Sequence, residues 1–232
     1  MNLISQIVNE LIDDKSSLNG ALLKTKVLAS RIGNQELLKW TNAELSGYNS
    51  EEDLPEYRKN IWNALKGNVL NGNMKYTNYE IPTINLDKEF ESSLRCSSFQ
   101  DSVSALESLL QFDGNLSIPV RPEIVHIIEQ NWQAMGNPYL SIISCNKLLS
   151  RSSIVDIISN VRSKLLDFML AIETEFGESV EIQDLKFKNE EITGIMHQTI
   201  INNNGDGNSI NTGNENSLSN NSGSIKKSNL GN

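Results

Sequence analysis

The sequence has little of what the commonest catalytic sites need and nothing suited to crossing a membrane. Its two cysteines and two histidines leave little material for a disulfide framework, a His-based zinc site or a catalytic triad. No apolar run approaches about 20 residues, so we expect no transmembrane helix. The first residues include Glu10, Asp13 and Asp14 but no basic residue, which argues against a secretory signal. These absences predict a cytoplasmic protein.

Basic residues are also in the minority. Lysine and arginine total 20 against 29 acidic residues, a formal net charge of −9. Nucleic-acid binding depends largely on basic side chains that neutralise phosphates, so we expect no tight non-specific binding of this kind. The P-loop, the dinucleotide-binding glycine fingerprint, HExxH and Gly-x-Ser-x-Gly are all missing from the sequence. The sequence therefore indicates no cofactor and favours a non-enzymatic role.

The C-terminal segment, residues 202–232, differs in composition from the rest. Its 31 residues contain 11 Asn, 6 Ser and 5 Gly, which predicts disorder because so few apolar groups cannot offset the ordering entropy. The alternative is order through self-assembly, because Ile201, Ile210, Leu218 and Ile225 recur every seven to nine residues, as β-solenoid rungs require. We therefore take Ile201, Ile210 and Leu218 as candidate self-association residues.

Residues 1–200 form the predicted folded domain, and residues 1–47 predict a head of three helices. Apolar residues recur there at spacings of three and four, as on one face of a helix. Gly33 and Gly47 are expected to end the second and third helices, and Asn34 to cap the third. The connections are short, so neighbouring helices should be antiparallel.

The middle region, residues 55–149, predicts a small antiparallel or mixed sheet. Asn71-Gly72 is a strong hairpin signal, because both residues tolerate positive φ, and it joins predicted strands over residues 57–70 and 73–81. Period two places Met74 and Tyr76 on one face of the second strand and Tyr79 and Ile81 on the other.

Strands and helices then alternate irregularly. Residues 116–120 predict a strand, a helix follows from Pro122 to Trp132, and residues 139–149 predict a strand whose apolar residues would also fit a helix. Irregular alternation favours an α+β fold over a doubly wound parallel sheet.

The longest periodic element covers residues 151–177 and predicts a long amphipathic helix that begins near Ser152. Its apolar residues are three or four apart and approach a heptad seam. One interpretation is pairing across a subunit interface, which would make the protein a homo-oligomer. The other is a helix across its own core, which a second apolar stripe favours. The interface residues would be Ile158, Leu165, Phe168 and Ile172.

One pattern leaves an enzymatic alternative open. Residues 180–187 predict a short strand or extended strap, on which Glu181, Asp184 and Lys186 give an acid-x-Lys spacing. Many Mg²⁺-dependent nucleases place a carboxylate and a lysine on one strand face around the metal and the attacked phosphate. The spacing also arises often by chance on a charged surface.

Several stretches resemble the AbiTii family of bacterial abortive-infection proteins. They are ALLKTKVLASRIGNQELLKW at residues 21–40, NAELSGY at 42–48, LPEYR at 54–58 and LLDFMLAIETEFG at 165–177. The resemblance covers most of residues 1–180, and the Asn-rich tail looks like an addition outside the family core. None of these motifs is a catalytic signature.

The resemblance implies a role in defence against bacteriophage. We expect a non-enzymatic sensor or oligomeric scaffold whose partners are a phage component or a separate effector protein. The alternatives are a Mg²⁺-dependent nuclease in the same defence role and a self-assembling structural protein without one.

Overall fold

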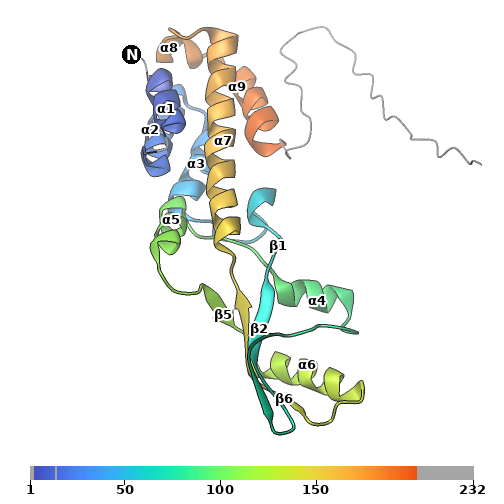
Figure 1. Ribbon diagram of the computed structural model, residues 1–232. Coiled ribbons are helices and arrows are strands. Elements are labelled where there is room, and N and C mark those ends of the chain that lie inside the picture. Colours follow the sequence, from blue (N-terminus) through green and yellow to red (C-terminus); the bar gives the residue numbers. More distant parts are fainter. Residues whose placement is uncertain (1–2, 14, 203–232) are drawn as a thin grey trace, which may run out of the picture.

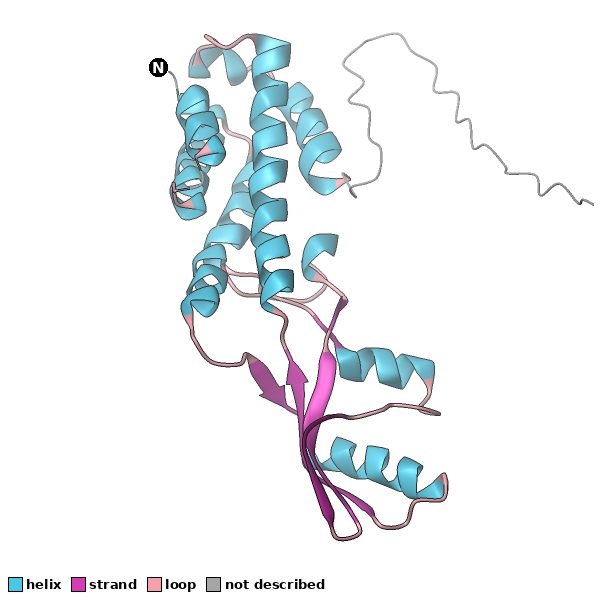
Figure 2. Cartoon of the chain, viewed as in Figure 1, coloured by secondary structure: helices cyan, strands magenta, loops and turns pink. Residues whose placement is uncertain are grey.

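The computed structural model describes residues 3–13 and 15–202, and these form an α+β fold. Helices fill one half of the molecule, and the strands with two further helices fill the other (Figures 1 and 2). Among the described helices, none combines the length and apolar character that a membrane crossing requires. The predicted repeat through Ile210 and Leu218 lies outside the described residues.

The helices are α1 (Leu3–Ile12), α2 (Leu18–Ile32), α3 (Gln35–Ser46), α4 (Lys88–Arg95), α5 (Val103–Gln111), α6 (Pro122–Ala134), α7 (Arg151–Phe176), α8 (Ile182–Leu185) and α9 (Asn189–Met196). Two other helical segments are the 3-10 helix η1 (Glu56–Arg58) and the π-helix η2 (His197–Ile201). The strands are β1 (Ile61–Trp62), β2 (Ala64–Asn71), β3 (Met74–Glu80), β4 (Cys96–Ser97), β5 (Ser117–Pro119) and β6 (Leu140–Leu148).

The first three helices confirm the predicted head, and their ends lie where local chemistry places them. Gly33 ends α2 with φ 79°, and its N–H bonds to the Ala29 carbonyl, a left-handed conformation that glycine adopts without steric cost. Asn34 then caps α3, because its side chain accepts a 2.9 Å hydrogen bond from the Leu37 N–H. A tight turn therefore folds α3 back along α2.

The long helix α7 runs along the whole helical half, and the other helices there lie around it (Figure 1). It begins at Arg151, one residue before the start expected near Ser152. Leu165, Phe168 and Ile172 are at most 2% exposed and pack in a core shared with α1, α2, α3 and α9. Ile158 is half-buried at the edge of this core. The apolar face thus lies across the chain's own core, the second of the two interpretations.

The sheet has the strand order β3-β2-β6-β5, and each neighbouring pair is antiparallel. Residues 139–149 therefore form a strand, β6, rather than a helix. Helices α4 and α6 lie on the same side of this sheet (Figure 2). Leu94 of α4 and Ile128 of α6 pack with Leu65 and Val69 of β2 in a second apolar core.

The predicted hairpin is confirmed, with Gly72 at φ 58° in its turn. Its first strand starts at Ala64, because Tyr57 and Arg58 lie in η1. The predicted placement of Tyr76 and Tyr79 on opposite faces is wrong: their ring centroids are 5.7 Å apart. The register shifts between Gly67 and Val69, and Asn78 has φ 52°. This β-bulge adds one residue to β3 and returns Tyr79 to the face of Tyr76.

The predicted strand or strap over residues 180–187 is also wrong, because Ile182–Leu185 is the short helix α8. In this helical turn Leu185 is 1% exposed in the core, Val180 and Ile182 pack against the same core, and Phe187 is 87% exposed. No strand lies beside this segment in the described chain, so extended backbone here would lack hydrogen-bond partners. The chain instead turns and continues into α9 and η2.

Candidate binding pocket

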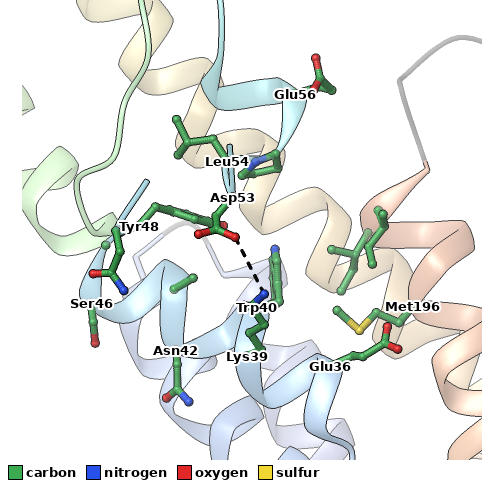
Figure 3. Close-up of a pocket in the computed structure, with 16 residues that line it drawn as sticks. Glu36, Lys39, Trp40, Asn42, Ser46, Tyr48, Asp53, Leu54, Glu56 and Met196 are labelled. Carbon is green, nitrogen blue, oxygen red and sulfur yellow. Dashed lines mark ion pairs between the residues drawn. The ribbon is translucent and has the colours of Figure 1, made fainter. Parts of the chain in front are cut away.

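A cavity of about 730 Å³ opens between α3, the loop that follows it, and the C-terminal segments α9 and η2. Trp40 on α3 and Leu54 on the loop form part of its apolar lining. Met196 on α9 points across the pocket toward Trp40 and Lys39 (Figure 3). Cavities of roughly 300–1,000 Å³ with a mainly apolar lining are typical of ligand sites.

The charged residues that line this pocket are mainly acidic. Among the described residues that line it, Glu36, Asp53 and Glu56 each contribute a carboxylate, and Lys39 contributes the one ammonium. The Lys39 Nζ lies 3.9 Å from Asp53 Oδ1, and both side chains are exposed (Figure 3). The net negative rim disfavours phosphate and other anions and favours neutral or cationic ligands.

A fully buried ion pair lies behind the pocket wall. Glu44 of α3 and Arg58 of η1 are both 0% exposed, with 2.5 Å between Glu44 Oε2 and Arg58 Nη2. The Arg58 Nη1 also donates to the carbonyls of Phe99 and Asp101, at 3.1 and 2.8 Å. Because buried charges are costly unless they are paired and hydrogen-bonded, these contacts hold η1 in one place against α3.

Two tyrosines complete the coordination of Glu44. The hydroxyls of Tyr48 and Tyr57 each donate to Glu44 Oε1 at 2.6 Å, and the Arg58 guanidinium lies 5.2 Å from the Tyr48 ring centroid. Burial first, and the Glu44 charge second, raise the pKa of both phenols. Both therefore stay protonated donors at neutral pH. Since Tyr48 lines the pocket, this network fixes part of its wall.

The opposite wall is held by a buried lysine and an exposed histidine–glutamate contact. Lys164 of α7 is 7% exposed, and its Nζ donates to the Ile200 carbonyl at 3.1 Å. Burial lowers the pKa of this lysine. At the rim, His197 Nε2 lies 2.6 Å from Glu36 Oε2. These contacts anchor α9 and η2, so the pocket has a fixed boundary on both sides.

The predicted self-association residue Ile201 lines this pocket and is 48% exposed. Sequence reasoning missed Glu44, Arg58 and Lys164. Two of them did carry a signal: Glu44 follows Trp40 and Thr41 on the buried face of α3, and Lys164 lies between Val161 and Phe168 on that of α7. A charged residue at an apolar-stripe position must find a buried partner.

The residues of the nuclease alternative lie away from this pocket, around α8. Glu181 and Asp184 line a separate cavity of about 290 Å³, but Lys186 does not. The lysine that does line it, Lys188, pairs with Glu191 at 2.9 Å. Within residues 3–13 and 15–202, no three His, Cys, Asp or Glu side chains come together as metal ligands.

The structure thus defines an α+β protein with a helical half and a small antiparallel sheet. The helical half carries an apolar pocket with acidic residues at its rim. The AbiTii family model matches residues 2–198, so the chain belongs to the AbiTii family. The family name refers to abortive infection, a form of bacterial defence against phage. No curated protein and no solved structure matches the chain.

Proposed function

We propose that this AbiTii protein acts as a non-enzymatic sensor in phage defence, with the pocket on α3 as its recognition site. The observation that carries the proposal is a cavity of about 730 Å³ whose walls are fixed by buried polar contacts. Walls that are already ordered reduce the entropy lost when a ligand binds. The partners would be a phage component in the pocket and a separate effector protein that responds to the complex.

The lining defines the chemistry of the ligand. Trp40, Leu54 and Met196 provide apolar contact area, and the carboxylates of Glu36, Asp53 and Glu56 surround it. Apolar contacts supply most of the binding free energy, while a negative rim selects among partners through charge. We therefore expect an apolar group that carries or adjoins a positive charge, as in an amphipathic peptide.

The test fills the pocket without touching the buried ion pair. Ala43 lines the cavity on α3, so Ala43→Phe places a ring inside it. Gln35→Phe puts the same ring at an exposed position of the same helix, outside the cavity lining. At equal expression and similar melting temperature, we expect phage plaques to increase for Ala43→Phe and to stay at the wild-type level for Gln35→Phe. Equal protection by both variants would contradict the proposal.

A third variant separates the enzymatic alternative. A Mg²⁺-dependent nuclease that uses Glu181, Asp184 and Lys186 would lose protection on Asp184→Asn, while its melting temperature stayed nearly unchanged. A sensor that uses the α3 pocket would keep protection in this variant, because Asp184 does not line that cavity. The two functions therefore predict opposite plaque counts for the same protein.

Edge strand β3 supports the second candidate, an oligomeric scaffold. All seven of its residues are exposed, and it ends the sheet at one side. An edge strand presents unpaired backbone groups with which a second copy can pair. Tyr76→Lys together with Tyr79→Lys would add like charges there, so a scaffold should dissociate in sedimentation velocity. A wild-type protein that sediments as a monomer at all concentrations would rule out this candidate.

A further inference from the structure

The outer edge of β3 carries one unpaired charge of each sign. β3 is the last strand on its side of the sheet, and all seven of its residues are exposed. Lys75 near its start and Glu80 at its end take part in none of the ion pairs within residues 3–13 and 15–202. Such an edge can bind another extended strand both by backbone hydrogen bonds and by charge.

The bulge at Asn78 makes the two halves of β3 alike. Tyr76 and Tyr79 lie on one face of the sheet, with their ring centroids 5.7 Å apart. Their outer neighbours, Lys75 and Glu80, therefore lie on the other face, because successive side chains of a strand alternate. From either end toward the bulge, β3 thus presents a charge on one face and then a tyrosine on the opposite face.

The backbone groups of β3 follow the same symmetry. The Ile81 N–H donates to the Leu65 carbonyl at 2.8 Å. Inward and outward positions alternate along an antiparallel strand, so the N–H and C=O of Glu80 point outward. The two residues that flank a two-residue hairpin turn bond to each other, so Met74 bonds to β2 and the backbone groups of Lys75 point outward. Both charged residues therefore offer backbone groups to a further strand.

We propose that β3 pairs antiparallel with β3 of a second copy about a two-fold axis at the bulge. Lys75 of each copy lies opposite Glu80 of the other, and Tyr76 of each copy lies opposite Tyr79 of the other. The two four-stranded sheets then continue into one another. This inference rests on the scaffold candidate, for which it supplies the interface and the register, and it does not depend on the pocket on α3.

The proposed register brings together residues that share a face of the sheet. A shift by one residue would place Lys75 opposite Tyr79, or Tyr76 opposite Glu80, and these residues project from opposite faces. Without the shift, the tyrosines meet at positions that lack backbone hydrogen bonds, where facing side chains are closest. The charged residues meet at positions that exchange backbone hydrogen bonds. Seven residues from each copy form a small interface, so we expect a concentration-dependent dimer.

Charge reversal in the full chain tests the ion pairs by sedimentation velocity. Lys75→Glu places a carboxylate opposite Glu80 of the second copy, so the dissociation constant should rise about tenfold. Lys75→Glu combined with Glu80→Lys restores opposite charges across the interface and should restore dimerisation. Lys26→Glu is the matched control, because Lys26 is exposed on α2 and should leave the dimer unchanged. Since Lys66 lies beside Glu80 in the same sheet, melting temperatures verify that each variant is folded. No recovery in the double variant would overturn the register.

Cysteine trapping tests the register by geometry, in full chains that carry Cys96→Ser and retain the buried Cys145. Tyr76→Cys protein is mixed with Tyr79→Cys protein, one of them carrying an affinity tag. Facing residues at positions without backbone hydrogen bonds come close enough for a disulfide. The mixed cross-link should therefore form about tenfold faster than the cross-link of either protein with itself. Equal rates, or faster cross-linking of Tyr76→Cys with itself, would overturn the inference.

The outcomes distinguish this inference from the proposed function. A wild-type protein that sediments as a monomer at every concentration overturns this inference and the scaffold together, while plaque counts for Ala43→Phe still decide the sensor. A dimer that Lys75→Glu leaves unchanged overturns pairing through β3 and points to a scaffold through another surface. Recovery in the charge-swapped variant with full phage protection by Ala43→Phe supports the β3 pairing and removes the sensor.

Discussion

Glu44 of α3 and Arg58 of η1 lie 2.5 Å apart, oxygen to nitrogen, although fourteen residues separate them and neither is exposed. This contact joins the helical head to the start of the sheet half. Arg58 continues the connection through the Phe99 and Asp101 carbonyls. The stability of the pocket wall therefore depends on one buried carboxylate that satisfies an arginine and two tyrosines.

Glu44→Gln should lower the free energy of unfolding by about 3–5 kcal/mol, because it leaves the Arg58 charge buried without its partner. The measurement is urea denaturation followed by circular dichroism. Glu56→Gln is the matched control, since its pair with Lys59 is largely exposed on the glutamate side and should contribute about 1 kcal/mol or less. Similar losses for the two variants would contradict the central role of Glu44.

Gly67 in β2 tests how closely two strands approach. A Cβ at this position would lie 1.8 Å from the Ser144 carbonyl oxygen of β6, so the backbone must shift. We expect Gly67→Ala to cost about 3 kcal/mol or more. In α9 a Cβ at Gly194 would meet nothing within 4 Å, and Gly194→Ala should stabilise by about 0.5–1 kcal/mol. In thermal unfolding, the melting temperature should fall for Gly67→Ala and rise for Gly194→Ala.

The buried thiol of Cys145 should make the protein less stable at alkaline pH. Burial raises the pKa of this thiol from 9.0 to about 11, so the folded protein holds the proton more tightly than the unfolded chain. Its contribution is fully present below pH 9 and is lost as the pH rises through about 11. The free energy of unfolding lost across this titration is about 2–3 kcal/mol.

The measurement compares wild type with Cys145→Ala by urea denaturation at pH 8 and pH 10.5. The buried tyrosines contribute equally to both proteins, so the difference between the two pH dependences isolates the thiol. Cys145→Ala should lose less stability between these pH values. An identical pH dependence would show that the Cys145 thiol does not titrate in this way.

Lys164→Met should loosen the C-terminal wall of the pocket. The Ile200 carbonyl loses its buried donor, at a cost of about 1–3 kcal/mol, so amide hydrogen exchange in residues 192–200 should accelerate. Lys147→Met is the matched control, because the Lys147 Nζ donates to the Cys96 carbonyl in the sheet half. Unchanged exchange in residues 192–200 for Lys164→Met would show that other contacts hold this wall.

The parts of the fold that local chemistry determines could be predicted from the sequence. The turn through Gly33 and Asn34, the Asn71–Gly72 hairpin and the periodicity of α7 each depend on residues that are close in the chain. Helix α4 was missed because Leu94 is its one buried aliphatic residue, so its apolar period is weak. The bulge at Asn78 was missed because positive φ in asparagine leaves no periodic signal.

The pocket could not be predicted, because its walls come from distant parts of the chain. Trp40 and Met196 belong to α3 and α9, which are about 150 residues apart in sequence and share one core with α7. Lys164 meets Ile200 across 36 positions and Arg58 meets Phe99 across 41. Periodicity within a short window contains no information on such pairs.

The packing of α1 against α7 also constrains when the core of the helical half can be completed during synthesis. The Arg162 side chain donates to the Leu11 carbonyl, 151 positions earlier in the chain. At typical bacterial translation rates that separation takes roughly 8–30 s. Until then the side chains of α1, α2 and α3 pack on one another but lack the contacts that α7 supplies. A chain that ends before α7 therefore lacks the α7 part of this core and the C-terminal wall of the pocket, so the complete pocket can form only after residues 1–201 have been synthesised.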